Sequence, residues 1–372
     1  MTTTPAKTPL YDWHVEHGGR MVDFAGWSMP VQYTSIVEEH RATRTAAGVF
    51  DVSHMGRLRF EGTDAAAFLD RLLTRRVTDL SLGRIRYSLV TNDQGGVLDD
   101  VLVGRLKTPS ERQYFLLVVN ASNRAKIVDW ITHHWPTAGD VEFSDRTEDT
   151  AMIAVQGPRA LDIVAPLVKA DVRQLGYYTG VVTETFGRIC IVSRTGYTGE
   201  DGVELIVRAA DAANVWKNIF LAGRDVGVTA AGLGARDTLR LESGMPLYGH
   251  ELSEQINPYQ AGLGFAVNLP DREFIGREAL AKFQADPQQP RRVGLTVAGR
   301  RVAREHSPVL AAGQVVGQVT SGTFSPTFDQ PIAMAYVRPE VAAVGTELQV
   351  DIRGRGESAR VVKLPFYTRS SG

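Results

Sequence analysis

The stretch at residues 193–207, with the sequence SRTGYTGEDGVELIV, contains a glycine-rich turn followed by an apolar run. The pattern predicts two strands joined by a tight reversal, because glycine adopts backbone angles that other residues avoid. Gly196, Gly199 and Gly202 are expected to supply those angles. Strand and helix patterns alternate on both sides of this stretch, which predicts mixed α and β structure over most of the chain.

Three carboxylates fall within this stretch. Glu200 and Asp201 lie in the turn, where solvated acids are expected. Glu204 lies inside the second strand, among apolar residues, and a carboxylate on a half-buried face needs a partner because an unpaired buried charge is costly. Two partners fit: an arginine such as Arg236, in a structural ion pair, or a ligand that presents two adjacent N–H donors, such as a guanine or pterin ring.

A second pair of acids, Asp99 and Asp100, lies in the sequence GGVLDDVLVGRL at residues 95–106. Adjacent residues on a strand point to opposite faces, so the two acids cannot share one site. Both faces of this strand are apolar, and at least one of the acids is expected to enter an enclosed place. It either accepts hydrogen bonds from turn amides or acts in proton transfer or in stabilising a cation.

The organisation of the chain changes near residue 271. Before it, strand and helix patterns alternate; after it, short β-rich runs are separated by Gly, Pro, Asn and Asp at hairpin-like spacing. We therefore expect an α+β protein with two mixed domains at residues 1–145 and 146–270, between which segments can be exchanged, and a C-terminal β-barrel domain at residues 271–372.

The composition excludes several classes of protein. The 41 basic and 42 acidic residues give a net charge of −1, so no global basic field is available for nucleic acid or an anionic membrane. The single cysteine, Cys190, excludes an internal disulfide and a zinc site built on several thiolates. No apolar run is long enough for a membrane span or a signal peptide, so a cytoplasmic location is expected. Sequence motifs for a P-loop, a dinucleotide fold or a metalloprotease are missing.

Several long blocks, taken together, resemble the glycine cleavage T-protein family, the aminomethyltransferases. The likeness runs from about residue 10 to residue 369 and is carried by HVEHGGRMVDFAGWSMPVQY, GVFDVSHMG, NDQGGVLDDVLV, VVNASNRAK, RTGYTGEDGVE, GLGARDTLRLESGMPLYG, VTSGTFSP and KLPFYTR. The resemblance implies three domains around a central folate site. It also implies transfer of a one-carbon unit from the aminomethyl-lipoyl arm of H-protein to tetrahydrofolate, which gives 5,10-methylene-tetrahydrofolate, ammonia and dihydrolipoyl H-protein.

The resemblance also implies roles for individual residues. Asp100 corresponds to the catalytic aspartate of the family, and Glu204 to the acid that holds the amino-pyrimidinone edge of the pterin. The other positions that match the family's folate site are Tyr197, Tyr87, Asn120, Arg236 and Arg369. Tetrahydrofolate is expected as a co-substrate, with no metal and no flavin. Lipoylated H-protein is the expected transient partner among the glycine cleavage components, with no nucleic acid or membrane partner.

Relatives with the same architecture define the alternatives. Dimethylglycine and sarcosine dehydrogenases carry a large flavin domain in front, which is not expected here because the block LYDWHVEHGG begins within the first dozen residues. Folate-dependent iron–sulfur assembly proteins carry a cysteine motif where this chain has RTGYTGE. A tetrahydrofolate-dependent demethylase and a non-catalytic folate-binding regulator remain as alternatives. The presence of Asp100 counts against the regulator.

Overall fold

The computed structural model describes residues 4–369. Internal contacts divide the chain into two compact units, each built from separate segments. The first unit contains the residues up to 70, 76–88 and 101–236, and the second contains 71–75, 89–100 and the residues from 237 onward. The domain boundaries expected near residues 145 and 270 stay a prediction.

A six-stranded sheet in the first unit has the order β11-β12-β13-β10-β4-β14. Its strands are β11 (Gly180–Thr185), β12 (Arg188–Ser193), β13 (Gly202–Arg208), β10 (Thr150–Gln156), β4 (Ala47–Asp51) and β14 (Val228–Ala230). The strand–turn–strand pattern at residues 193–207 forms the end of β12 and most of β13. These strands pair antiparallel, with Ser193 opposite Glu204.

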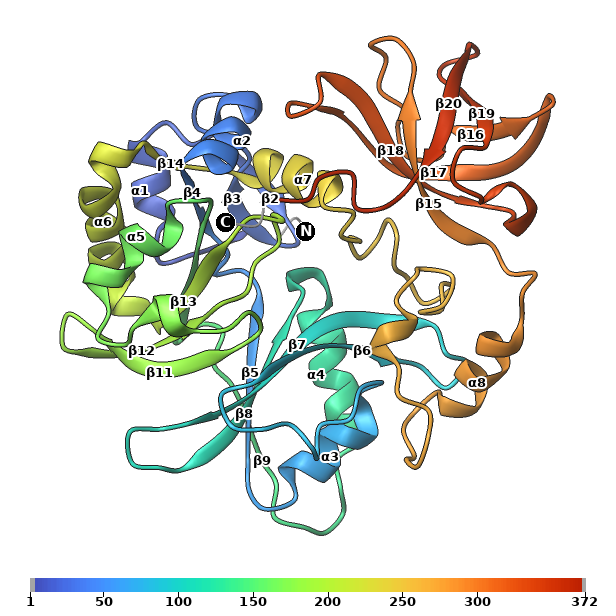
Figure 1. The fold of residues 1–372 in the computed structure, drawn as a ribbon. Coiled ribbons are helices and arrows are strands. Elements are labelled where there is room, and N and C mark those ends of the chain that lie inside the picture. The colour runs from blue at the N-terminus through green and yellow to red at the C-terminus, as the bar shows by residue number, and fades with distance from the viewer. Residues whose placement is uncertain (1–3, 370–372) are drawn as a thin grey trace. The chain divides into compact units, whose positions relative to one another are not determined.

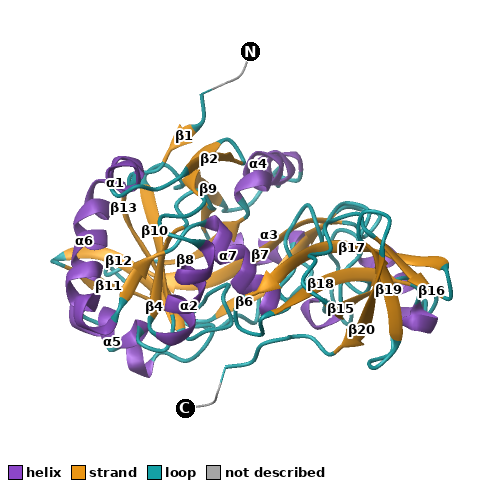
Figure 2. Cartoon of the chain, turned by 90° about the horizontal axis from the view of Figure 1, so that it is seen from above, coloured by secondary structure: helices purple, strands orange, loops and turns teal. Residues whose placement is uncertain are grey.

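Helices α5 (Ala160–Val164) and α6 (Ala212–Gly223) pack against this sheet and lie along one side of its strands (Figures 1 and 2). Val215, Trp216 and Ile219 project from one face of α6 into the core, which is the spacing of an amphipathic helix. On β13, the residues Val203, Leu205 and Val207 enter the same core. The alternation of side chains along a strand therefore turns Glu204 to the opposite face.

A five-stranded sheet has the order β6-β7-β8-β5-β9, and a small sheet has the order β1-β3-β2. The strands of the first are β6 (Ile85–Thr91), β7 (Val97–Lys107), β8 (Gln113–Val119), β5 (Gly56–Glu61) and β9 (Glu142–Asp145). Those of the second are β1 (Ala6–Lys7), β3 (Trp27–Pro30) and β2 (Met21–Phe24). The remaining helices are α1 (Tyr11–Glu16), α2 (Ile36–Thr45), α3 (Ala65–Leu72), α4 (Arg124–His133), α7 (Leu233–Glu242) and α8 (Arg277–Ala285).

The C-terminal strands close into a six-stranded barrel with the order β15-β18-β17-β16-β19-β20, drawn in orange and red in Figure 1. The strands are β15 (Arg291–Val297), β16 (Pro308–Ala311), β17 (Gln314–Ser325), β18 (Gln330–Val337), β19 (Glu347–Asp351) and β20 (Gly356–Val362). Pairing of β15 with β20 completes the ring, which leaves no free edge. The predicted α+β class with a C-terminal barrel is confirmed.

Candidate functional site

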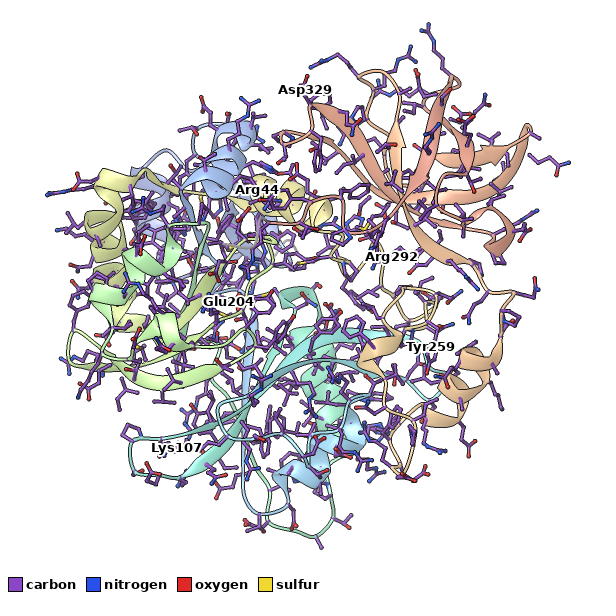
Figure 3. All side chains as sticks on the ribbon, in the orientation of Figure 1. Arg44, Lys107, Glu204, Tyr259, Arg292 and Asp329 are labelled. Atoms are coloured by element: carbon purple, nitrogen blue, oxygen red, sulfur yellow. The ribbon has the colours of Figure 1, made fainter. Side chains whose placement is uncertain are left out.

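Glu204 lies on β13 in the first unit and is labelled in Figure 3. Its side chain is only 6% exposed, and its carboxylate accepts a hydrogen bond from the hydroxyl of Thr195. Burial raises the pKa of Glu204, while the Thr195 hydrogen bond and the charge of Arg236 act against the rise. Within residues 4–369, Glu204 and Arg236 form no direct ion pair. The carboxylate is therefore held in a place of low polarity with one hydroxyl donor.

The turn between β12 and β13 is held by the side chain of Gln156, at the end of β10. Gln156 Nε2 donates to the carbonyl of Thr195 at 3.1 Å, and its Oε1 accepts from Thr198 Oγ1 at 3.0 Å. A Cβ atom on Gly196 would lie 1.9 Å from Gln156 Oε1. A side chain at position 196 would therefore have to displace the Gln156 side chain and break these hydrogen bonds.

The expectation that all three glycines supply unusual backbone angles was wrong for two of them. Only Gly199 has a positive φ, of 79°. Gly202, like Gly196, is needed for space, because a Cβ atom there would lie 2.3 Å from the carbonyl oxygen of Val155. Sequence spacing does not distinguish a glycine that turns the chain from one that admits a neighbour.

The two acids of the turn are not solvated as expected. Glu200 is 6% exposed and pairs with Arg44 of α2 at 3.0 Å. Asp201 binds Arg194 through both carboxylate oxygens, at 3.0 and 2.6 Å. Both acids therefore stiffen the loop that carries Tyr197, and the partner of Glu200 comes from a helix more than a hundred residues away in the sequence.

Arg236 lies in the first turns of α7 and brings a positive charge to Tyr197. Its guanidinium carbon stands 4.7 Å from the centre of the Tyr197 ring, a cation–π arrangement. Burial lowers the pKa of Arg236, and the Tyr197 and Glu204 side chains counteract this. The structure thus brings together three of the residues expected at the site: Glu204, Tyr197 and Arg236.

His54 lies near this group, although as a lone histidine in the sequence DVSHMG it is expected to be structural or solvated and not part of the site. Its side chain is 2% exposed, and its pKa is lowered to about 3, first by burial and then by the charge of Arg236. Its neighbours are held firmly, since the buried Arg57 donates hydrogen bonds to the carbonyls of Ser53 and Met55. A lone histidine in a sequence gives no signal of such a position.

The other expected site residues are distributed as follows. Tyr87 lies on β6 and is half-buried, and Asn120 directly follows β8 and precedes a short helical turn before α4; both belong to the first unit. Asp100 lies on β7 and Arg369 near the C-terminus, and both belong to the second unit. Asp99 is the fully buried acid of its pair, whereas Asp100 is half-buried.

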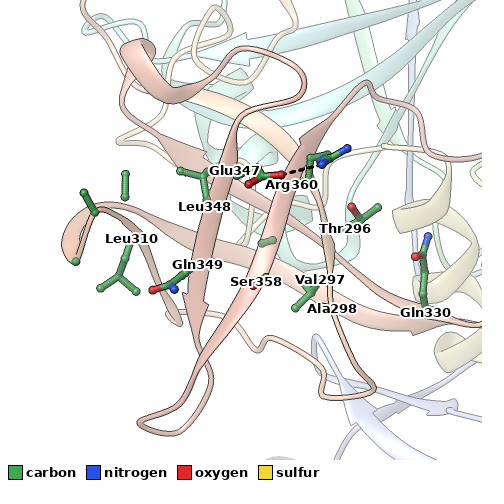
Figure 4. A pocket seen from close by; sticks show the side chains of 14 residues that line it. Thr296, Val297, Ala298, Leu310, Gln330, Glu347, Leu348, Gln349, Ser358 and Arg360 are labelled. Atoms are coloured by element: carbon green, nitrogen blue, oxygen red, sulfur yellow. Dashed lines mark hydrogen bonds and ion pairs between the residues drawn. The ribbon is translucent and has the colours of Figure 1, made fainter.

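Two cavities lie away from these residues. One, of about 630 Å³, is on the barrel near the exposed Glu347–Arg360 ion pair, which measures 2.8 Å (Figure 4). Another, of about 470 Å³, lies in the first unit beside β11. Across residues 4–369, no cluster of three or more His, Cys, Asp or Glu side chains is placed to hold a metal ion. No helix in the same range combines the length and apolar character needed to cross a membrane.

Comparison with known proteins covers nearly the whole chain. The family model described as GCVT N-terminal domain matches residues 10–271, and that described as glycine cleavage T-protein C-terminal barrel domain matches residues 291–368. An aminomethyltransferase from Moorella thermoacetica is 50% identical over 363 residues, which are 98% of each chain. One from Bacillus subtilis is 43% identical over 365 residues, which are 98% of this chain and 99% of that one.

A solved structure agrees with these relatives. The glycine cleavage system aminomethyltransferase T from Bartonella henselae superposes with a TM-score of 0.89 at 33% identity, covering 97% of this chain and 98% of that one. Sequence and fold thus match over both the mixed α/β region and the barrel, and the chain belongs to the glycine cleavage T-protein family of aminomethyltransferases.

Proposed function

We propose that this enzyme transfers the one-carbon unit of S-aminomethyldihydrolipoyl H-protein to tetrahydrofolate. The products are 5,10-methylene-tetrahydrofolate, ammonia and dihydrolipoyl H-protein. Family membership supports the reaction class, and the observation that carries the folate part is the buried carboxylate of Glu204 beside Tyr197 and Arg236. The cytoplasmic location expected from the sequence stays a prediction.

Glu204 supplies the acceptor pair for the pterin. A carboxylate has two oxygens side by side, which match the adjacent N–H groups of an amino-pyrimidinone edge. In a site shielded from water such hydrogen bonds are stronger than in bulk solvent, because the local dielectric is low. Tyr197 and Tyr87 would pack against the ring. Asn120 and Arg236 would lie beside the folate, and Arg369 would hold its p-aminobenzoyl-glutamate end.

Asp100 is proposed as the catalytic carboxylate. The aminomethyl carbon passes through an iminium-like state in which positive charge develops, and a carboxylate stabilises that charge. The same carboxylate can hydrogen-bond the attacking folate nitrogen and take up its proton. Overall, the C–N and C–S bonds of the aminomethyl donor break, and the carbon forms bonds to two folate nitrogens. The two protons that these nitrogens lose are taken up by the departing amine, which leaves as ammonia, and by the thiolate of the dihydrolipoyl arm.

The experiment that tests the proposal is a single reaction of purified protein, tetrahydrofolate and H-protein loaded with the aminomethyl group. Ammonia and methylene-tetrahydrofolate are followed together, against reactions lacking the protein or lacking folate. Equal amounts of both products that depend on protein and folate support the proposal. If folate binds but neither product exceeds the reaction without enzyme, the assigned donor is wrong.

A further inference from the structure

Glu39 is a buried carboxylate to which the reaction described above assigns no role. It lies on α2 and its side chain is 0% exposed. Its oxygen Oε1 accepts from the backbone N–H groups of Tyr33 at 2.6 Å and Thr34 at 3.1 Å, and Oε2 accepts from Gly232 N–H at 2.9 Å. The carboxylate therefore joins two segments that are about two hundred residues apart in the sequence.

The segment reached through Gly232 is the start of α7. Gly232 directly precedes this helix, and Arg236 N–H donates to the Gly232 carbonyl at 3.1 Å. Two further bonds fix the same turn: Ala231 N–H donates to Val49 and Gly234 N–H donates to Val31, both at 2.9 Å. A negative group at this end also suits the positive end of the helix dipole.

The packing around this turn leaves no space for adjustment. A Cβ atom on Gly232 would lie 2.5 Å from the backbone carbonyl of Val31, and one on Gly234 would lie 2.6 Å from the Ile36 side chain. The start of α7 is thus fixed by backbone contacts on one side and by the Glu39 carboxylate on the other. Because Arg236 lies one turn beyond Gly232, the position at which α7 begins determines where the Arg236 guanidinium lies.

We propose that Glu39 is a positioning residue: its carboxylate fixes the start of α7 and thereby holds the Arg236 guanidinium over the Tyr197 ring, 4.7 Å from its centre. The link to folate binding rests on the proposed function, whereas the link to Arg236 does not. Glutamine cannot replace this carboxylate, because it has one acceptor oxygen and its NH₂ group would face an N–H donor on one of the two sides.

The first test is spectroscopic and needs no folate. A guanidinium above an aromatic ring has its Nε–H resonance displaced by the ring current, and the Arg236 signal can be assigned with Arg236→Lys. We expect Glu39→Gln to reduce this displacement. An unchanged Arg236 resonance in a folded Glu39→Gln protein would overturn the proposal, whether or not the chain binds folate. Glu39→Asp, which keeps the charge but shortens the reach, gives the same readout if the glutamine variant does not fold.

The second test uses folate affinity and kinetics. In Glu39→Gln we expect the Kd and KM for tetrahydrofolate to rise about tenfold, with kcat at saturating folate changed less than about twofold, because loss of a uniform binding interaction acts on KM. In an Arg236→Gln background, Glu39→Gln should add no further loss of affinity. Additive losses would show that Glu39 does not act through Arg236.

The matched control is Glu61→Gln in the same unit. Glu61 is also a shielded carboxylate, with 12% of its side chain exposed, and it pairs with Arg59 at 2.7 Å. The Glu61→Gln substitution should lower the melting temperature without changing the folate Kd or the Arg236 resonance. A fall in melting temperature in Glu39→Gln with an unchanged Kd and resonance would assign Glu39 a structural role only. Failure of the wild-type chain to bind folate would count against the proposed function and leave the spectroscopic result to decide on Glu39.

Discussion

At the scale of single residues, His54 makes stability depend on pH. Its folded pKa of about 3 lies below the ordinary value of 6.5. Between these values the unfolded chain binds a proton that the folded chain does not, so stability falls as pH falls through this range. Between pH 7 and pH 5, His54 should remove about 2 kcal/mol from the free energy of unfolding.

Urea unfolding of the wild type and of His54→Gln at pH 7 and pH 5 checks this prediction. Burial also raises the pKa of Glu204 and of Glu39, so these carboxyls contribute to the pH dependence of stability. Because they are present in both proteins, the difference between the two proteins isolates the contribution of His54. Asp51, whose pKa is lowered to about 2 by the hydrogen bond and charge of His14 against the effect of burial, contributes below about pH 4. Equal losses of stability in both proteins would contradict the assignment.

The two central acids should separate binding from chemistry. Asp100→Asn should keep folate binding and reduce kcat about 100-fold or more, since positioned acid–base groups contribute on that order. Glu204→Gln should weaken folate binding about tenfold or more through loss of charged hydrogen bonds. Calorimetric titration with folate and steady-state kinetics measure the two effects. An unchanged Kd in Glu204→Gln, or unchanged turnover in Asp100→Asn, would remove that residue from its assigned role.

Part of this residue-level picture can be predicted from the sequence and part cannot. Strand alternation is local, so the burial of Glu204 opposite a core face follows from its neighbours. The partner of Glu200 does not, because Arg44 is brought to it by the packing of α2. The environment of His54 likewise depends on Arg57 and Arg236, which no local pattern connects to it.

At the scale of elements, α7 is anchored at its later turns by a buried ion pair. Arg240, 2% exposed, binds Glu251, 0% exposed, at 2.9 Å and also donates to Ser321 Oγ at 2.9 Å. Burial alone would raise the pKa of Glu251, but the Arg240 charge and its hydrogen bonds hold this pKa below its usual value. The pair connects α7 to β17 of the barrel within the second unit.

Breaking this pair should be costly, whereas replacing it whole should not. Glu251→Gln is expected to lower the free energy of unfolding by about 3 kcal/mol, because the buried Arg240 charge then keeps only the half-exposed carboxylate of Asp237, at 2.8 Å, as its charged partner. Arg240→Met combined with Glu251→Leu should recover most of the loss. The control Glu347→Gln breaks an ion pair that is 61% and 78% exposed, and should change stability by less than about 1 kcal/mol. Chemical denaturation of the four proteins gives the comparison.

At the scale of the whole molecule, the two units share the chain repeatedly. Residues 71–75 and 89–100 of the second unit interrupt the sequence of the first, and strands β6 and β7 each begin in one unit and end in the other. Unfolding of either unit would therefore disrupt β6 and β7, which contain residues of both units. The protein should therefore unfold in one cooperative transition.

The tryptophans provide the means to measure this. Trp13, Trp27, Trp130, Trp135 and Trp216 all belong to the first unit. Tryptophan fluorescence thus reports on the first unit, while far-ultraviolet circular dichroism reports on both. Coincident melting curves by the two methods are expected. A circular dichroism transition that occurs without a change in fluorescence would show that the second unit unfolds alone.

The large-scale architecture could be predicted only in part. The hairpin pattern of the C-terminal segment predicted an all-β barrel or sandwich, because each strand of a hairpin pairs with its neighbour in sequence. Closure of the barrel depends on β15, which pairs with the distant strands β18 and β20, and no hairpin pattern indicates this. The place of β4 beside β10 could not be predicted in this way. These strands are about a hundred residues apart in the sequence. The alternation of side chains along a strand predicts which of its faces is buried, but not which other strand it pairs with.

The space shared by Gln156 and Gly196 has a consequence for how the sequence can change over evolutionary time. Side chains at the two positions would compete for the same space, because a Cβ atom on residue 196 would lie 1.9 Å from Gln156 Oε1. An alanine at position 196 should be damaging while glutamine remains at 156, and much less so once position 156 has become small. Melting temperatures of Gly196→Ala, Gln156→Ala and the double variant would reveal this dependence. Mutational paths through this turn are therefore ordered, with the change at position 156 coming first.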